Sequence, residues 1–375
     1  MVKRSRLRSG RGKARRSSLG GAMGGLMAAM IGSTAKAMTR AATTATKAAV
    51  RSAAKKPKVT AKKPKAAPKP ASSVRVAPVR VAAVPKTARF TSGSYGCEAG
   101  TRSYKLYVPS TATGPLPLVV MLHGCGQTPD DFAKGTRMNA LAEERGVIVL
   151  YPAQSRDAHP NRCWNWFREG DQGRGAGEPA ILSGMVRQIL TQQPIDPARV
   201  YVAGLSAGGS AAMALAHAYP DLFAAVGCHS GLPMGAARDH GSALMAMKQG
   251  NSGIRLNHPL PTIIFHGGDD RVVAPRNGRL VALRALEPFA RLEVTEQARQ
   301  IADGRAYVRT SHRVGRGRSY VEHWLIKGSG HAWSGGSRTG RFVDPAGPDA
   351  SQEMLRFFLR HKTTLRTRRA GPGAA

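Results

Sequence analysis

Short, uninterrupted apolar runs recur along the chain, separated by segments rich in glycine and polar residues. Continuous runs of this length are typical of strands that are buried on both faces of a parallel sheet. We expect such strands at 118–122, 200–203, 223–228, 261–265 and 320–326. Helices are predicted at the alanine-rich segment 211–218 and at 351–361. This alternation predicts an α/β protein with a mostly parallel central sheet flanked by helices.

The strand at 200–203 runs into Gly204-Leu-Ser206-Ala-Gly208, and the helix at 211–218 follows. A strand, a G-x-S-x-G turn and a helix in this order form a nucleophile elbow, which holds the serine in a strained conformation with its hydroxyl exposed. The small residues at 204 and 208 let strand and helix approach closely. The motif alone also occurs in ordinary glycine-rich loops, so the interpretation depends on the rest of a catalytic set.

A serine hydrolase of this kind needs an oxyanion loop before the serine, and an acid and a histidine after it. The segment His123-Gly-Cys125-Gly-Gln127 follows the first predicted strand, and its glycines let backbone N–H groups face a developing oxyanion. We assign the amides of Cys125 and Ala207 as the two donors. His123 is expected to shape this loop by hydrogen bonding.

Candidates for the acid and the base follow the last two predicted strands. The strand at 261–265 leads to Asp269 and Asp270, and one of these carboxylates should orient the base. His331 lies between small residues after the strand at 320–326, which predicts a general base, whereas His323 within that strand is expected to be structural. Metal-ligand spacings and a phosphate-binding loop are missing from the sequence, so we expect no cofactor and no metal.

Six motifs in register make residues 93–361 similar to the polyhydroxybutyrate (PHB) depolymerase esterases of the α/β-hydrolase superfamily. These motifs are Tyr104-Lys-Leu-Tyr-Val-Pro109, His123-Gly-Cys-Gly-Gln127, Cys163-Trp-Asn-Trp-Phe167, Gly204-Leu-Ser-Ala-Gly208, His266-Gly-Gly-Asp-Asp270 and Gly330-His-Ala-Trp333. The family's acid typically lies four residues after the histidine of the His-Gly pair. The resemblance therefore implies an α/β-hydrolase fold and a catalytic triad of Ser206, His331 and Asp270, with Asp269 as second choice.

The resemblance also implies a substrate class. It predicts a serine esterase that hydrolyses short-chain hydroxyacyl esters or poly(3-hydroxybutyrate) oligomers through an acyl-enzyme. Feruloyl and acetyl-xylan esterases share the triad and are the alternative. Trp164, Trp166 and Trp333 lie on or beside the expected active-site loops. They could form an apolar wall for the acyl group, or they could pack in the core beneath the loops.

One residue and one long connection are also predicted to lie near this site. Glu178 begins a predicted helix, where the helix dipole favours an acidic side chain. The connection 229–259 is longer than usual between two core strands and could form part of the rim of the pocket.

Charge divides the chain into a basic tail at 1–90, a catalytic domain at 91–362 and a short basic C-terminal tail at 363–375. The first 90 residues hold 23 Lys and Arg and no acid, within a chain of net charge +35. This Ala-, Lys- and Pro-rich segment cannot bury enough apolar surface to offset its ordering entropy, so we expect disorder. Binding of an anionic polymer or granule surface through this tail is a candidate function of another class.

The start of the chain also bears on localisation. A basic beginning, a weakly apolar stretch at 19–31 and Ala35-Lys-Ala37 match the layout of a secretory signal, which favours an extracellular or periplasmic protein. A cytoplasmic, granule-associated protein is the alternative, and no run has the length of a transmembrane helix.

The four cysteines fit an exported protein. We predict that Cys125 pairs with Cys163, because both lie in loops expected at the C-terminal edge of the sheet. Cys228 is expected to be buried in a strand.

Overall fold

The computed structural model describes residues 87–110, 113–289 and 291–364. The expectations of disorder and of a secretory signal concern residues that lie outside this range, as does most of the predicted C-terminal tail. The first regular element of the described chain begins at Arg89 and the last ends at Phe358.

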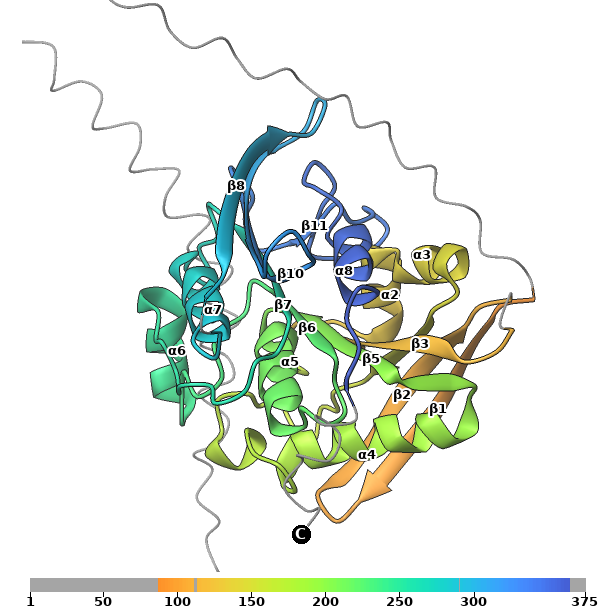
Figure 1. Cartoon of the computed structure of the whole chain (residues 1–375). Helices are drawn as coiled ribbons and strands as arrows, with labels where there is room; N and C mark the ends of the chain where they lie inside the picture. The colour runs from red at the N-terminus through yellow and green to blue at the C-terminus, as the bar shows by residue number, and fades with distance from the viewer. Residues whose placement is uncertain (1–86, 111–112, 290, 365–375) are drawn as a thin grey trace, which may run out of the picture. The chain divides into compact units, whose positions relative to one another are not determined.

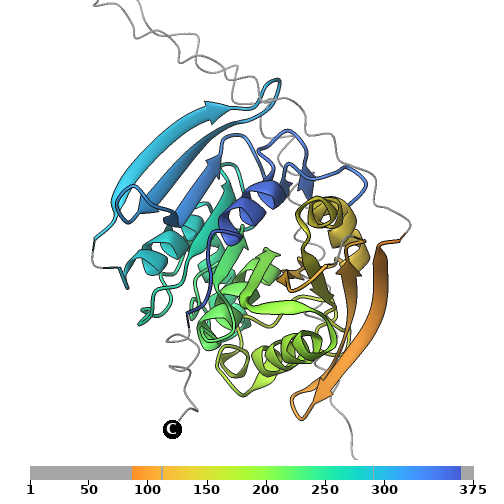
Figure 2. The ribbon, with the colours of Figure 1, turned by 45° about the vertical axis from the view of Figure 1, so that its right-hand side comes forward.

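The centre of the domain is a ten-stranded sheet with the order β1-β2-β4-β3-β5-β6-β7-β10-β9-β8. Its strands are β1 (Arg89–Cys97), β2 (Gly100–Val108), β3 (Leu116–Leu122), β4 (Ile148–Pro152), β5 (Ile195–Leu205), β6 (Ala225–His229), β7 (Thr262–Gly267), β8 (Glu293–Gln300), β9 (Ala306–Arg313) and β10 (Ser319–Ile326). Six neighbouring strands pair in parallel, namely β4, β3, β5, β6, β7 and β10. This confirms the predicted parallel sheet. Antiparallel pairs, which we did not predict, extend both edges (Figure 2).

Helices cover both faces of the sheet (Figure 1). They are α2 (Pro129–Thr136), α3 (Met138–Arg145), the short 3-10 helix η2 (Glu169–Asp171), α4 (Gly177–Gln192), α5 (Ala207–Ala218), α6 (His240–Gln249), α7 (Arg276–Leu286) and α8 (Ala350–Phe358). Both predicted helices are confirmed, as α5 and α8. None of the helices in the described part is long and apolar enough to cross a bilayer.

The side chains of β3 alternate between two hydrophobic cores, one on each face of the sheet. Leu118 and Val120 pack in the core that includes residues of α4, α5 and α7. Val119 and Met121 pack in the opposite core, with residues of α2, α3 and α8. Full burial of each such side chain stabilises the fold by about 1.5–3 kcal/mol, so apolar residues are needed on both faces. This explains why the central strands are continuous apolar runs in the sequence.

The parallel register brings the C-terminal ends of β3, β5, β7 and β10 to one edge of the sheet. In open α/β sheets, ligand sites form in the loops that leave this edge. Two short strands, β11 (Trp333–Ser334) and β12 (Val343–Asp344), pair in parallel within the segment that follows β10.

Candidate active site

Ser206 stands in the sharp turn between β5 and α5. Its backbone has φ 58° and ψ −121°, a conformation that is strained for a residue other than glycine. A Cβ atom at Gly208 would lie 2.1 Å from the carbonyl oxygen of Leu122, and one at Gly204 would lie 2.3 Å from Gly208 itself. Only glycine fits at these two positions. The turn therefore has the geometry of the predicted nucleophile elbow.

His331 and Asp270 form a hydrogen-bonded pair in the loops after β10 and β7. The Nδ1 atom of His331 lies 2.7 Å from Oδ2 of Asp270, and Asp269 is exposed to solvent. Oδ1 of Asp270 accepts the N–H groups of Val272 and Val273, each at 2.9 Å. Burial opposes ionisation of Asp270, but the hydrogen bond and charge of His331 and the Val273 amide bring its pKa below the ordinary value.

Ser206, Asp270 and His331 follow strands that end at the same edge of the sheet. Asp270 is almost fully buried, whereas Ser206 and His331 are each partly exposed. A buried carboxylate bonded to a partly exposed imidazole, with a partly exposed serine at the same sheet edge, fits a hydrolytic triad.

The loop after β3 is held by His123 and by a disulfide. Nδ1–H of His123 donates to the carbonyl of Gly124 at 2.8 Å, and Nε2 accepts the N–H of Gln154 at 3.1 Å. Burial lowers the pKa of His123 to about 4, so the ring is neutral at pH 7. The predicted disulfide between Cys125 and Cys163 is confirmed, and Cys228 is buried in β6 as expected.

The hydrogen bond from His123 also fixes the direction of the next amide. In a trans peptide the carbonyl and the following N–H point to opposite sides, so the Cys125 N–H points away from His123. Among the residues that the structure describes, neither this amide nor that of Ala207 donates to a protein acceptor. Both are therefore available to an added acceptor.

A distant segment, which the sequence pattern did not predict, braces this loop. Arg341 donates its backbone N–H to Asp131 at 3.0 Å, its carbonyl accepts Gln127 Nε2 at 3.1 Å, and its guanidinium donates to the Gly126 carbonyl. Phe342 follows with φ 54° and an exposed fraction of 46%. No local pattern signals a contact between positions more than 200 residues apart.

The tryptophans expected near the active site are buried. Trp164 is fully buried and its indole N–H donates to the His123 carbonyl at 3.1 Å. Trp333 is equally buried, with its N–H donated to Ser351 Oγ at 3.0 Å, and Trp166 packs against Phe167 in the core. In this structure Trp164 and Trp333 offer no surface to a ligand. Their burial favours the core-packing alternative: the Trp164 indole bonds to the loop after β3, and the Trp333 indole bonds to Ser351 in α8.

Glu178 lies in the first turn of α4, as predicted, but it is buried. It accepts the backbone N–H of Asn165 at 2.8 Å and that residue's side-chain amide at 2.9 Å, and it also accepts Nε2 of Gln154. Burial, and then the charge of Asp171, raises the pKa of Glu178 to about 7. This carboxyl group therefore supports the Gln154 segment that holds His123.

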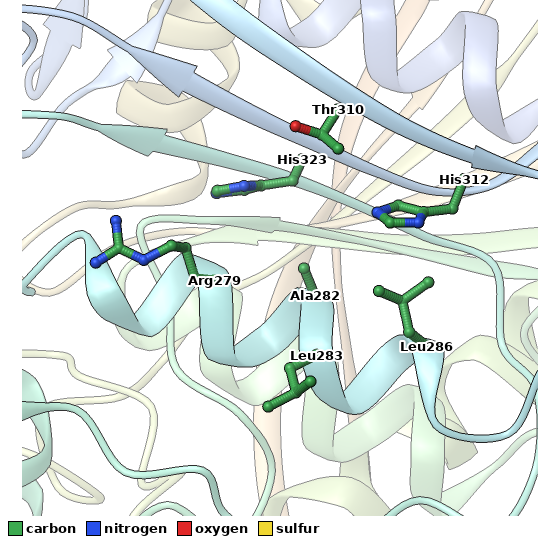
Figure 3. A pocket seen from close by; sticks show the side chains of 7 residues that line it. All are labelled: Arg279, Ala282, Leu283, Leu286, Thr310, His312 and His323. Carbon is green, nitrogen blue, oxygen red and sulfur yellow. The ribbon is translucent and has the colours of Figure 1, made fainter. Parts of the chain in front are cut away.

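His323 lies within β10, where it pairs with Ile264 of β7 and Thr310 of β9, in agreement with its structural interpretation. It faces α7 from β10, and together with His312, Arg279 and apolar residues of α7 it lines a hollow of about 230 Å³ (Figure 3). The long connection 229–259 contains α6 and lines a second hollow of about 390 Å³. Neither hollow includes Ser206, Asp270 or His331 among its lining residues.

Comparisons with known proteins match the chain to a family and to individual relatives. The family described as Esterase PHB depolymerase matches residues 102–309, more than half of the chain. Poly(3-hydroxyalkanoate) depolymerase C of Paucimonas lemoignei is 33% identical over 255 residues, 64% of this chain and 60% of that relative's length. Feruloyl esterase B of Neurospora crassa is 26% identical over 272 residues, 67% of this chain and 86% of that protein.

Among solved structures, an acetyl xylan esterase from Aspergillus awamori superposes with a TM-score of 0.53 at 19% identity. The match covers 68% of this chain and 93% of that structure, and it supports the fold. Sequence motifs, sheet topology and the family match agree: the chain has the α/β-hydrolase fold and belongs to the PHB depolymerase family of esterases.

Proposed function

We propose that this protein is a serine hydrolase of carboxylic esters, with Ser206 as nucleophile and His331 as general base. The observation that carries the proposal is the strained Ser206 at the same sheet edge as the Asp270–His331 pair. Ser206 Oγ attacks the ester carbonyl while His331 Nε2 takes its proton. His331 then returns the proton to the departing alkoxide as the carbonyl–oxygen bond breaks. Water releases the acyl group from Ser206 by the same proton route.

Asp270 and two backbone amides complete this mechanism. The Asp270 carboxylate accepts Nδ1–H of His331, which leaves Nε2 free as the base and stabilises the imidazolium. The amides of Cys125 and Ala207 donate to the oxyanion of the tetrahedral intermediate. Hydrogen bonds of this type typically contribute roughly 100- to 1,000-fold to turnover.

The substrate class we propose is short-chain hydroxyacyl esters and poly(3-hydroxybutyrate) oligomers. The relative from Paucimonas lemoignei is named for activity on poly(3-hydroxyalkanoate), and two exposed apolar side chains adjoin the catalytic loops. Val272 is 38% exposed beside Asp270, and Phe342 is 46% exposed beside the braced oxyanion loop. We propose these two side chains, in place of the buried tryptophans, as contacts for the apolar part of the ester.

Feruloyl or acetyl-xylan ester hydrolysis is the second candidate, because similar proteins carry those names. A substrate panel separates the two. We expect kcat/KM for 3-hydroxybutyrate dimers and trimers to exceed that for methyl ferulate and acetylated xylan, with turnover lost in Ser206→Ala. A hundredfold preference for methyl ferulate or for acetylated xylan would assign the enzyme to the second candidate. Retained turnover in Ser206→Ala would refute the esterase mechanism.

We also propose that the basic segment 1–90 binds anionic polymers or surfaces, and that the protein is exported. The first proposal is supported by 23 Lys and Arg without an acid, and the second by the disulfide, which is typical of oxidising compartments. Heparin affinity should fall, and lose most of its salt dependence, when residues 1–86 are removed. Unchanged affinity would reject the polymer proposal. Recovery of the native host's protein solely from the cytoplasm would reject export.

A further inference from the structure

His229 ends β6 between the serine and histidine segments, and it contacts both. Its backbone carbonyl accepts the N–H of Ser206 at 2.8 Å. Its ring atom Nε2 accepts the N–H of Ser334 at 3.0 Å. Ser334 lies in β11, three residues after His331. One fully buried residue therefore links the strained backbone of the proposed nucleophile to the segment that follows the proposed base.

The surroundings of the ring fix its proton and its plane. Since Nε2 accepts a hydrogen bond, the proton is on Nδ1, which lies 3.1 Å from Ser230 Oγ and donates to it. The ring stacks between Phe265 and Trp333, with centroids 5.8 Å and 5.1 Å away. Burial lowers the pKa of His229 to about 3, and His266 and His331 act in the same direction. The ring is therefore a neutral acceptor with a single orientation.

The other hydrogen bonds of β11 run to the segment after it. Trp333 donates its N–H to the Phe342 carbonyl at 2.7 Å, and Ser334 Oγ donates to the Pro348 carbonyl at 2.6 Å. These bonds join β11 to the segment 342–348, and the indole N–H of Trp333 joins it to Ser351 in α8. The bond from Ser334 N–H to His229 ties the β11 backbone directly to a strand of the central sheet, next to Ser206.

We infer that His229 is a positioning residue that sets the loop of His331 relative to Ser206. The inference rests on the proposed function, because it concerns the alignment of the proposed nucleophile and base. Ser334 is fully buried, so loss of the acceptor leaves its N–H unpaired and favours a displaced β11. A displacement of about 1 Å at a catalytic group can cost on the order of a hundredfold in rate.

The test compares His229→Met with His229→Gln, using p-nitrophenyl butyrate as substrate. Methionine fills a similar volume without an oxygen or nitrogen acceptor, whereas the side-chain oxygen of glutamine can take the place of Nε2. We expect His229→Met to lower kcat by roughly 10- to 100-fold with KM changed less than about threefold. His229→Gln should recover most of that loss.

The matched control is His217→Met. His217 is also buried and neutral, but it lies in the last turn of α5 and contacts His258. A substitution there changes packing without touching β11, so kcat should stay near the wild-type value. Equal kcat in His229→Met and His217→Met would overturn the inference, as would equal losses in His229→Met and His229→Gln.

A second pair of variants and a parallel assay of Ser206→Ala complete the test. If His229→Met does not fold, His229→Gln is compared with His229→Asn, whose shorter amide places its oxygen near Nδ1 instead of Nε2. The glutamine variant should then have the higher kcat by about tenfold or more, and equal values would overturn the inference. Ser206→Ala is assayed in parallel: its retained turnover would refute the proposed function. Its lost turnover together with unchanged kcat in His229→Met would refute only the role of His229.

Discussion

The two halves of the candidate site are held in place by different kinds of interaction. The oxyanion loop is cross-linked by the Cys125–Cys163 disulfide and braced by Arg341. The acid–base half, with Asp270, His331 and His229, is held by hydrogen bonds to the buried side chains of Asp270 and His229. Covalent closure makes the first half resistant to small changes in side chains. The second half depends on the acceptors and protonation states of a few residues.

This contrast predicts different sensitivities. Burial of hydrogen-bonded groups costs little folding free energy while every donor has its acceptor. The cost becomes large when one partner is removed. A disulfide acts chiefly by restricting the unfolded chain, so its loss affects global stability as well as the loop. Substitutions in the acid–base half should therefore reduce turnover most, with a smaller loss of stability from any group left unpaired. Loss of the disulfide should reduce stability most and turnover less.

The largest expected effect is in the acid–base half. Asp270→Asn should lower kcat on the order of a thousandfold or more, because the amide no longer enforces the His331 tautomer. Asp269→Asn is the matched control: Asp269 is exposed, so kcat should change less than about threefold. Steady-state kinetics on a short acyl ester measure both. The reverse pattern would exchange the roles of the two carboxylates.

Removal of the disulfide tests the oxyanion half. The bridge spans 38 positions, so Cys125→Ser with Cys163→Ser should lower the free energy of unfolding by about 3–4 kcal/mol. Turnover should also fall by roughly tenfold or more as the Cys125 amide loses its fixed direction. Urea unfolding and kcat are measured beside Cys97→Ser, which removes an exposed free thiol. A stability loss without a change in kcat would show that the loop keeps its geometry without the bridge.

Acid should destabilise the domain through its buried histidines. Burial lowers the pKa of His217 and His229 to about 3 and that of His123, His323 and His361 to about 4. A lowered folded pKa means that unfolding takes up protons between these values and 6.5. Each of these histidines therefore lowers the free energy of unfolding by about 1.4 kcal/mol per pH unit as the pH falls from 6.5 toward its folded pKa. Glu178 has the opposite effect, because its pKa is raised to about 7 and its contribution to stability grows as the pH falls. It is one group against five histidines.

Urea midpoints at pH 7.5 and 5.5 measure this dependence. We expect a clear decrease at the lower pH, and a smaller decrease in His217→Leu, which removes one of the buried imidazoles. His240→Gln is the control, because His240 is exposed on α6. Equal midpoints at the two pH values would contradict the assignment of neutral buried histidines.

The smallest effect is expected at Phe342, the exposed side chain beside the oxyanion loop. Phe342→Ala should raise KM for butyryl and longer esters by roughly three- to tenfold, with kcat nearly unchanged, because apolar contact area is lost from the bound ester. Leu283→Ala removes a side chain of similar exposure on α7 and should leave KM unaltered. Equal KM values for Phe342→Ala and wild type would remove Phe342 from the substrate site.

The sequence was sufficient for features that local patterns encode. Continuous apolar runs locate the parallel strands, and glycines at 204 and 208 mark the elbow because other residues would collide there. Features that depend on tertiary contacts were not predictable. Arg341 meets the oxyanion loop across more than 200 positions, and His229 resembles any histidine at a strand end. The tryptophans show the same limit, because aromatic residues beside a motif can pack beneath the loops as well as face the ligand.

The most direct test of the central claim is covalent labelling of the nucleophile. A serine-directed fluorophosphonate forms a stable adduct only with a serine that a neighbouring base activates. We predict one adduct per chain, located by peptide mass spectrometry at Ser206, with esterase activity lost in proportion to labelling. Ser206→Ala should give neither adduct nor turnover. An adduct at another serine, or hydrolysis by Ser206→Ala within tenfold of wild type, would contradict the account.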